Sequence, residues 1–387
     1  MQYPMNIFLL SSLIRTIVLI FGHFQDQYSL VPYTDIDYNV FTHGAQLISQ
    51  GLSPYDHPTY RYSPLLALLL LPNIWVPSFG KVLFCCIDQL SAFVLQKLVP
   101  DSKFVVYLFL FNPIMVNIST RGNADSLICF LLILFIKNFS SLNIVFSGLV
   151  FGFAVYWRIF PVILALTVIL NIYYETGKFF NIVLFLLVSF ATFCLLCTLF
   201  EIIYPNSFKF SILFHLTRSG SPVDYRHNFS IFWLSNFLTL CHPSFLLQNK
   251  LIHGFSLLIQ LIIHLAISLK YYNDFIKAFY LHIVVFVFLS KVYTVQYFSW
   301  YFAILPLILF DVNRDELICV LKLKLSWILS FGMWLLVAFS LEFKGINTFD
   351  CLYLCSIVFS STSIIINFKL IEKLKKKSNK LSENYKC

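Results

Sequence analysis

Charged side chains are scarce in this sequence. Only 12% of the 387 residues are Asp, Glu, Lys or Arg, against about 25% in ordinary soluble domains. Hydrophobic residues make up 59%, well above the roughly 45 to 50% of such domains. A soluble globular protein is therefore excluded. The apolar residues suffice for roughly eleven or twelve membrane helices of about 20 residues, which leaves too little polar chain for a separate water-soluble domain.

The sequence also lacks the patterns of several other classes of protein. No period of about 20 to 50 residues recurs, and no Gly, Ser or Gln tract marks a linker. The ten cysteines lie mostly inside apolar runs, and Cys194 and Cys197 form a lone C-x-x-C without a partner pair at zinc spacing. We therefore expect one polytopic membrane domain over residues 1–368, with no disulfide framework and no metal site.

Long uncharged stretches punctuated by charges predict an all-α polytopic membrane protein with eleven to thirteen transmembrane helices, and twelve is the working number. The first span carries Arg15 and has no small-residue cleavage site, so we expect it to be retained. The candidate stretches are about 5–23, 62–80, 79–99, 104–120, 124–137, 138–157, 159–174, 179–200, 227–249, 251–269, 276–291, 292–310, 325–341 and 351–368.

The distribution of Lys and Arg predicts the orientation. A cytoplasmic N-terminus places most of these residues on cytoplasmic loops and on the tail, as the positive-inside rule requires. Residues 369–387 are then a basic cytoplasmic tail, which carries much of the net charge of +9.

The first non-cytoplasmic loop, about residues 24–63, concentrates ionisable residues beside hydrocarbon, and such residues are functional candidates. Tyr38, Phe41, Ala45 and Ile48 recur at helical spacing, which predicts an amphipathic helix in the membrane interface. Thr34 or Asp35 would be its N-cap. A carboxylate at a helix N-terminus stays ionised and can accept a proton. The ionisable residues are Asp35, Asp37, His43, Asp56, His57 and Arg61.

Asp35 and Asp37 form a D-x-D pair and are the candidate catalytic residues. The alternative interpretation of Asp35 is a plain helix cap, worth about 1 kcal/mol. In nucleotide-sugar transferases such a pair holds a metal ion against a diphosphate. That chemistry needs a soluble nucleotide-binding fold, and this sequence does not predict one.

Further loops on the same face supply positive charge. Arginine presents a planar fork of donors that suits phosphate. Gathered near one membrane surface, these residues would suit a lipid-linked phosphate that enters sideways from the bilayer. The alternative for each is a side chain that snorkels to the interface or pairs with an aspartate. The residues are Arg121, Arg158, Arg218, Arg226 and Lys291.

A series of motifs resembles, in order, the PIG-M family of the endoplasmic reticulum, GPI mannosyltransferase I. The motifs are TDIDY (34–38), SPYDHPTYRYSPLL (53–66) followed by LLLPN, RGNADS (121–126), GFAVYWRIFP (152–161), HLTR (215–218), RHNFS (226–230), SKVYTVQYFSWY (290–301), MWL (333–335) and LEFKGINTF (341–349). Among the departures, His43 and Ser63 stand where the family usually has Asp and Thr, Arg158 replaces a usual Lys, and residues 219–223 lengthen one loop. His43 indicates that no third aspartate is required beside the D-x-D pair.

The resemblance implies a GT-C glycosyltransferase fold and a residue set for substrate binding. The activity would be inverting transfer of the first mannose, in α1,4 linkage, from dolichyl phosphate mannose to the glucosamine of a GPI precursor, glucosaminyl phosphatidylinositol. The site would face the lumen of the endoplasmic reticulum, with a small single-span accessory subunit resembling PIG-X and no certain cofactor; a role for a divalent cation stays open. The implied binding residues are Arg61, Arg121, Asn123, Asp125, Arg158, His215, Arg218, Arg226, His227, Asn228, Lys291, Gln296 and Glu342.

Three alternatives remain at this point. A mannosyltransferase of N-glycan assembly would use the same donor with another acceptor. A transporter would also be polytopic, but we would expect repeated halves and helices broken at mid-membrane. A noncatalytic subunit is expected to have lost the acids, whereas Asp35 and Asp37 are both present.

Overall fold

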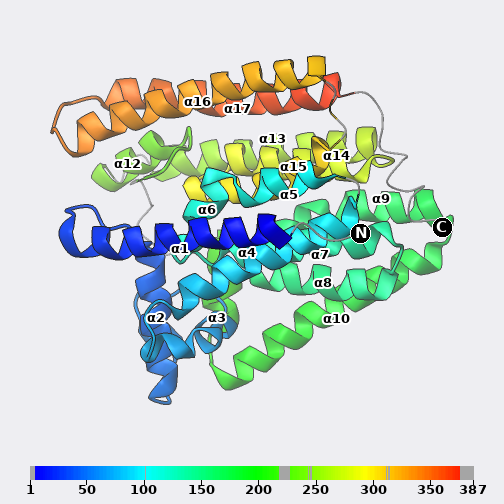
Figure 1. Cartoon of the computed structure of the whole chain (residues 1–387), viewed down its shortest axis with the longest axis horizontal. Coiled ribbons are helices and arrows are strands. Elements are labelled where there is room, and N and C mark those ends of the chain that lie inside the picture. The colour runs from blue at the N-terminus through cyan, green and yellow to red at the C-terminus, as the bar shows by residue number, and fades with distance from the viewer. Residues whose placement is uncertain are drawn as a thin grey trace.

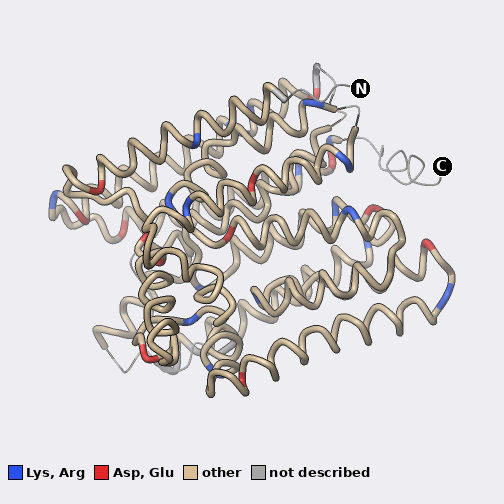
Figure 2. Tube along the Cα trace, turned by 60° about the horizontal axis from the view of Figure 1, so that its bottom comes forward, with Lys and Arg blue, Asp and Glu red and all other residues tan. Residues whose placement is uncertain are grey.

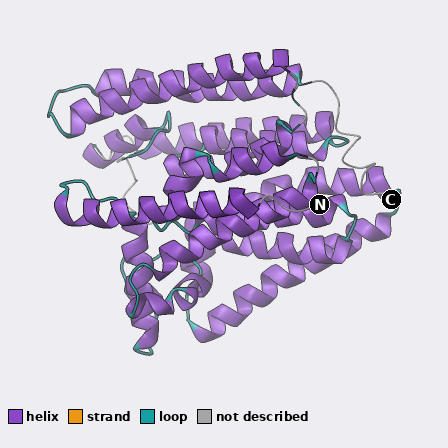
Figure 3. Cartoon of the chain, in the orientation of Figure 1, coloured by secondary structure: helices purple, strands orange, loops and turns teal. Residues whose placement is uncertain are grey.

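A computed structural model describes residues 5–100, 102–217, 227–242, 244, 246–310, 312 and 314–374. The described residues form helices joined by short loops and contain no strand (Figure 3), which confirms the predicted all-α class. The basic tail predicted over residues 369–387 is described only as far as residue 374.

Twelve helical segments follow one another in the order that the charge spacing predicts. Two of them begin as a 3-10 helix and one is broken. They are α1 (Met5–Tyr28), α4 (Phe79–Leu98), α5 (Lys103–Leu110) with α6 (Pro113–Thr120), α7 (Asp125–Ser140), α8 (Ile144–Trp157), η3 (Phe160–Leu164) with α9 (Ala165–Thr176), α10 (Phe179–Ile203), α13 (Leu246–Tyr271), α14 (Phe275–Leu289), η6 (Val295–Tyr297) with α15 (Phe298–Ile308), α16 (Arg314–Glu342) and α17 (Phe349–Lys373).

Length divides these segments into two groups. Among the described residues, six helices are long and apolar enough to cross a membrane, or seven if α5 and α6, bent by 52°, count as one span. The break follows from Pro113, which has no N–H to donate to the preceding turn. Of the other segments, α8, α9 and α15 are shorter because part of the uncharged stretch forms a loop or a 3-10 turn, whereas α7 and α14 fill stretches that are themselves short. The number of full-length spans is thus smaller than the number of apolar stretches.

Two of the candidate stretches do not form spanning helices. Residues 62–80 form α3 (Pro64–Leu69) and η2 (Leu71–Ile74), because prolines at 64, 72 and 77 interrupt the run. Within 227–249 the helix of the described residues before α13 begins is the short α12 (Trp233–Cys241). Both stretches lie beside the end of the bundle that carries the D-x-D pair.

The long helices run side by side (Figure 1), with α16 and α17 paired along one edge and α8 and α10 along the opposite edge. Close approach of α8 and α10 requires glycine, since a Cβ at Gly152 would lie 2.3 Å from the Ser189 carbonyl oxygen. At one end α2 (Ile36–Ser49), η1 (Pro54–Asp56) and α3 lie across the bundle. We call this the site end.

The amphipathic helix predicted after the D-x-D pair is confirmed as α2. Its buried face, which includes Tyr38, Phe41 and Ala45, packs on the bundle. The Tyr38 hydroxyl donates to the Pro77 carbonyl at 2.7 Å and so fastens α2 to the loop before α4. Asp35, one of the two predicted caps, is the N-cap.

Charged residues gather toward the helix ends and loops (Figure 2). Arg15, inside the first span, is an exception, and it lies 3.1 Å from Asp88 of α4 in a buried ion pair. Arg15 also donates to the Leu110 carbonyl at 3.0 Å. A buried charge is tolerated only with such partners, which explains how α1 accommodates an arginine.

Candidate active site

Asp35 is fixed by three hydrogen bonds, one from the start of α2 and two to the loop before α7. Its backbone N–H donates to the Arg121 carbonyl at 3.0 Å. Its Oδ1 accepts the Asp37 N–H at 3.1 Å, as expected of an N-cap. Its Oδ2 accepts from the Asn123 amide at 3.1 Å. The carboxylate is therefore held in one orientation while part of it stays exposed.

Asn123 connects the segments of the site. Its Nδ2 also donates to Gln296 Oε1 at 2.9 Å, and its Oδ1 accepts the Asp125 N–H at 2.9 Å. Gly122 makes this approach possible, because its φ is +86° and a Cβ there would lie 2.4 Å from the Tyr38 ring. The RGNADS motif therefore positions Asp35 through both Asn123 and the Arg121 carbonyl.

Asp37 lies beside a buried ion pair. Arg158, at the C-terminus of α8, donates to Asp125 Oδ1 from Nη2 at 2.7 Å and from Nε at 3.1 Å. The guanidinium lies over the Tyr62 ring, 5.4 Å from its centroid. Loss of water around Asp37, together with the Asp35 charge, raises the pKa of Asp37 from 3.8 to about 6, although Tyr62 and Arg158 oppose this shift. Asp37 is therefore a stronger base than a surface aspartate and still mostly ionised at neutral pH.

A second group contains Arg61 and His215. The Arg61 guanidinium lies 4.9 Å from the Phe210 ring and 5.0 Å from the Phe214 ring. Its Nη1 donates to the Tyr60 carbonyl at 2.8 Å, and the His215 ring N–H donates to the Arg61 carbonyl at 2.8 Å. Aromatic contacts of this kind limit the rotamers of an arginine. Arg61 directly precedes Tyr62, so this group adjoins the D-x-D pair.

The other predicted residues that the structure describes form a third group, contributed by the segment before α12, the loop before η6 and the C-terminal end of α16. Asn228 Oδ1 accepts the N–H groups of Ser230 at 2.9 Å and Tyr293 at 3.2 Å. Its amide donates to the Lys291 carbonyl at 3.3 Å, so Asn228 joins two loops. His227 lies 3.8 Å from Glu342, and both are exposed. Arg218 and Arg226 lie outside the described residues.

The structure therefore unites part of the predicted set. Asp35, Asp37 and the residues numbered 121, 123, 125, 158 and 296 form one cluster at the site end. Sequence reasoning missed Tyr62. Its ring lies against the Arg158 guanidinium, and its hydroxyl forms a hydrogen bond with the Asp37 carboxylate. Its position beside Arg61 in the YRYSP motif was the available signal.

The described residues contain no group of three or more His, Cys, Asp or Glu side chains that could hold a metal ion. The Asp35 carboxylate accepts hydrogen bonds from two amide groups, the Asp37 N–H and the Asn123 side chain. The expected absence of a protein metal site stays a prediction, and a role for a divalent cation stays open.

Comparison with known proteins agrees with the resemblance of the motifs. A family model described as mannosyltransferase (PIG-M) matches residues 118–371. A GPI mannosyltransferase 1 of Dictyostelium discoideum is 34% identical over 95% of this chain and 91% of its own length. The Danio rerio protein described as GPI alpha-1,4-mannosyltransferase I, catalytic subunit, is 36% identical over 94% and 95% of the two chains. The family model, which spans more than half of the chain, and these relatives place the chain in the PIG-M mannosyltransferase family, as a polytopic membrane glycosyltransferase.

Proposed function

We propose that this protein transfers the first mannose from dolichyl phosphate mannose to the glucosamine of a GPI precursor, in α1,4 linkage. The names of its relatives support this choice of pathway. The observation that carries the proposal is the D-x-D pair, in which an oriented carboxylate lies beside one of raised pKa at the site end. A site at a membrane surface suits a donor and an acceptor that are both lipids.

Asp35 is proposed as the general base. The acceptor hydroxyl attacks the anomeric carbon of mannose while the bond from that carbon to the donor phosphate oxygen breaks, through an oxocarbenium-like state with inversion. The hydroxyl proton passes to an Asp35 carboxylate oxygen, and dolichyl phosphate leaves. Asn123 and the Asp37 N–H orient that carboxylate. Asp37 is proposed to orient the acceptor sugar through its ionised carboxylate.

The leaving phosphate needs positive charge more than it needs a proton. We assign this role to Arg218 and Arg226, as the sequence predicts, with Arg121 beside Asp35. The Arg121 Nε is buried and has no hydrogen-bond partner among the described residues, so a donor there is available to a ligand. Arg158 is neutralised by Asp125 and is better suited to positioning Tyr62 and Asp37 than to binding phosphate.

The setting of the reaction is part of the proposal. We infer a luminal site in the endoplasmic reticulum membrane, a glycolipid acceptor and a small single-span subunit resembling PIG-X. No cofactor is proposed, and transfer measured with and without a chelator tests whether a divalent cation takes part.

A microsomal assay tests this function. Membranes from cells that lack their own enzyme and express this chain receive labelled dolichyl phosphate mannose with glucosaminyl phosphatidylinositol or with a lipid-linked N-glycan intermediate. We expect label only on the glucosaminyl lipid, in a form that an α-mannosidase releases. Label on the N-glycan intermediate alone would contradict the proposal.

A further inference from the structure

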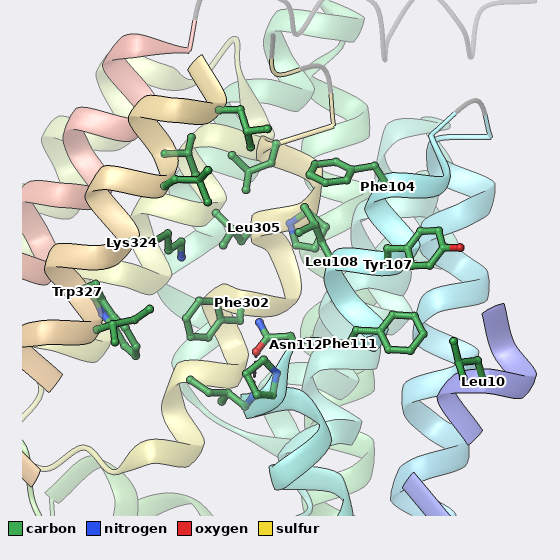
Figure 4. A pocket seen from close by; sticks show the side chains of 18 residues that line it. Leu10, Phe104, Tyr107, Leu108, Phe111, Asn112, Phe302, Leu305, Lys324 and Trp327 are labelled. Atoms are coloured by element: carbon green, nitrogen blue, oxygen red, sulfur yellow. Dashed lines mark hydrogen bonds between the residues drawn. The ribbon is translucent and has the colours of Figure 1, made fainter. Parts of the chain in front are cut away.

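A groove of about 660 Å³ lies between α5–α6, α15 and α16, at the broken span (Figure 4). Its described wall consists of apolar and aromatic side chains and Asn112, and Lys324 is the one charged residue among them. Several wall residues are exposed on the outer surface of the bundle, including Leu10, Phe104 and Leu321. An apolar surface of this kind on a membrane protein contacts lipid chains.

Two hydrogen-bond donors on α16 line this groove without an acceptor. Lys324 lies over the Phe302 ring, with its ammonium 4.6 Å from the centroid, and forms no ion pair with a described residue. The buried Trp327 Nε1 has no hydrogen-bond partner in the described part of the chain. Residues three apart share one face of a helix. An uncompensated cation inside an apolar membrane groove is costly, and an anionic occupant would remove that cost.

The groove lies close to the D-x-D pair when the distance is taken along the helix axes. Phe302 follows Gln296 by six residues along η6 and α15, a rise of roughly 9 Å at 1.5 Å per residue. On the other wall, Asn112 and Pro113 lie at the start of α6, and Arg121 is the C-cap of that helix, roughly 12 Å away by the same rise. Gln296 and Arg121 both belong to the site cluster. Lys324, which lies over the Phe302 ring, is therefore roughly 9 to 12 Å along the helix axes from the site cluster. It lines a groove with residues that are exposed on the outer surface of the bundle.

Size and charge select the occupant. A transmembrane helix about 30 Å long and 10 Å wide needs roughly 2,000 Å³, so the groove is too small for one. Its volume suits a single chain segment, in the range of small-ligand sites at about 300 to 1,000 Å³. One cation matches one phosphodiester charge. A polyprenyl phosphate sugar has a single chain and one such charge, whereas a phospholipid or GPI precursor has two chains or a larger head group.

We propose that this groove is the lateral entry site of the polyprenyl phosphate donor, in which Lys324 and the Trp327 N–H capture the phosphate before it passes to the site and the first isoprene units pack on the aromatic wall. This inference rests on the proposed donor. Lys324 acts on capture and not on the chemical step, so its loss raises KM for the donor and leaves kcat unchanged.

Two pairs of variants test the proposal in the full-length chain. Lys324→Met removes the charge, and Lys322→Met, on the exposed part of the same helix, is its control. Leu321→Trp partly fills the groove, while Leu325→Trp changes an equally exposed leucine outside it (59% and 56% exposed). We expect Lys324→Met to raise donor KM about tenfold, the size of one lost charge-assisted contact. Leu321→Trp should raise KM for a long-chain donor and spare a short-chain one.

A binding measurement separates this proposal from the proposed reaction. A photoreactive polyprenyl phosphate that carries no mannose is expected to cross-link to α16 in the wild type and in Lys322→Met, and several-fold less in Lys324→Met. If this labelling pattern is seen but the wild type transfers no mannose, the proposed function is wrong and the groove assignment still holds. Equal labelling of the two lysine variants overturns the assignment. A change in KM for the acceptor alone would assign the groove to acceptor chains and also overturn it.

Discussion

Asp37→Asn is expected to stabilise the protein at neutral pH while it abolishes mannose transfer. The Asp37 carboxyl has a pKa of about 6 in the folded protein against 3.8 for the ordinary group, because burial and the Asp35 charge disfavour its ionised form. That difference corresponds to about 3 kcal/mol. Because the folded-state pKa is raised, this contribution to the free energy of unfolding is fully present below pH 3.8 and declines between pH 3.8 and about 6. It is lost above about pH 6.

Asparagine removes the titration, so the gain in stability from Asp37→Asn should grow as the pH rises through this interval and be complete above it. Thermal unfolding in detergent, followed by intrinsic fluorescence between pH 4 and 8, measures it as a rise in Tm that grows with pH. Asp56→Asn, at an exposed carboxylate in the same loop, is the control and should change stability by less than about 0.5 kcal/mol. An Asp37→Asn protein that is less stable than the wild type at pH 8, or whose Tm differs from that of the wild type by the same amount at every pH, would refute the argument that ionised Asp37 destabilises the fold.

Other expectations follow from the same cluster. Transfer by the wild type should fall as pH drops through about 6, where Asp37 takes up a proton, and a profile flat to pH 5 would remove Asp37 from the reaction. Gly122→Ala should be more destabilising than Gly51→Ala: both glycines have positive φ, costing an alanine about 1 to 2 kcal/mol, but only at Gly122 would a Cβ meet the Tyr38 ring; equal melting temperatures would contradict this. Arg158→Met should cost about 3 to 5 kcal/mol of stability because Asp125 is left buried without its partner, whereas Arg158→Lys should restore most of it in a detergent melting assay.

Much of the fold follows from the spacing of charges alone. The uncharged stretches predict the twelve segments because a charge inside hydrocarbon is expensive, and helical spacing after Asp37 predicts α2. The break at Pro113 and the loss of two candidate spans were not predicted, since length without charge does not tell a continuous helix from two short ones.

The site was predictable in its members but not in its contacts. The D-x-D pair and the RGNADS motif stand out in the sequence as ionisable groups beside hydrocarbon. Their joining through Asn123, and the ion pair of Arg158 with Asp125, depend on how distant helices pack. The raised pKa of Asp37 likewise depends mainly on its burial in the assembled site, an effect of long-range packing that no local pattern encodes.

The most direct test of the central claim is a single-turnover transfer measured with the purified full chain, labelled dolichyl phosphate mannose and glucosaminyl phosphatidylinositol. Wild type and Asp35→Asn are compared, because asparagine keeps the helix cap and the contact with Asn123 but cannot accept the proton. We expect the variant to bind donor normally and to transfer mannose about 10² to 10⁴ times more slowly. Transfer at the wild-type rate by Asp35→Asn would contradict the assignment of this carboxylate as the base.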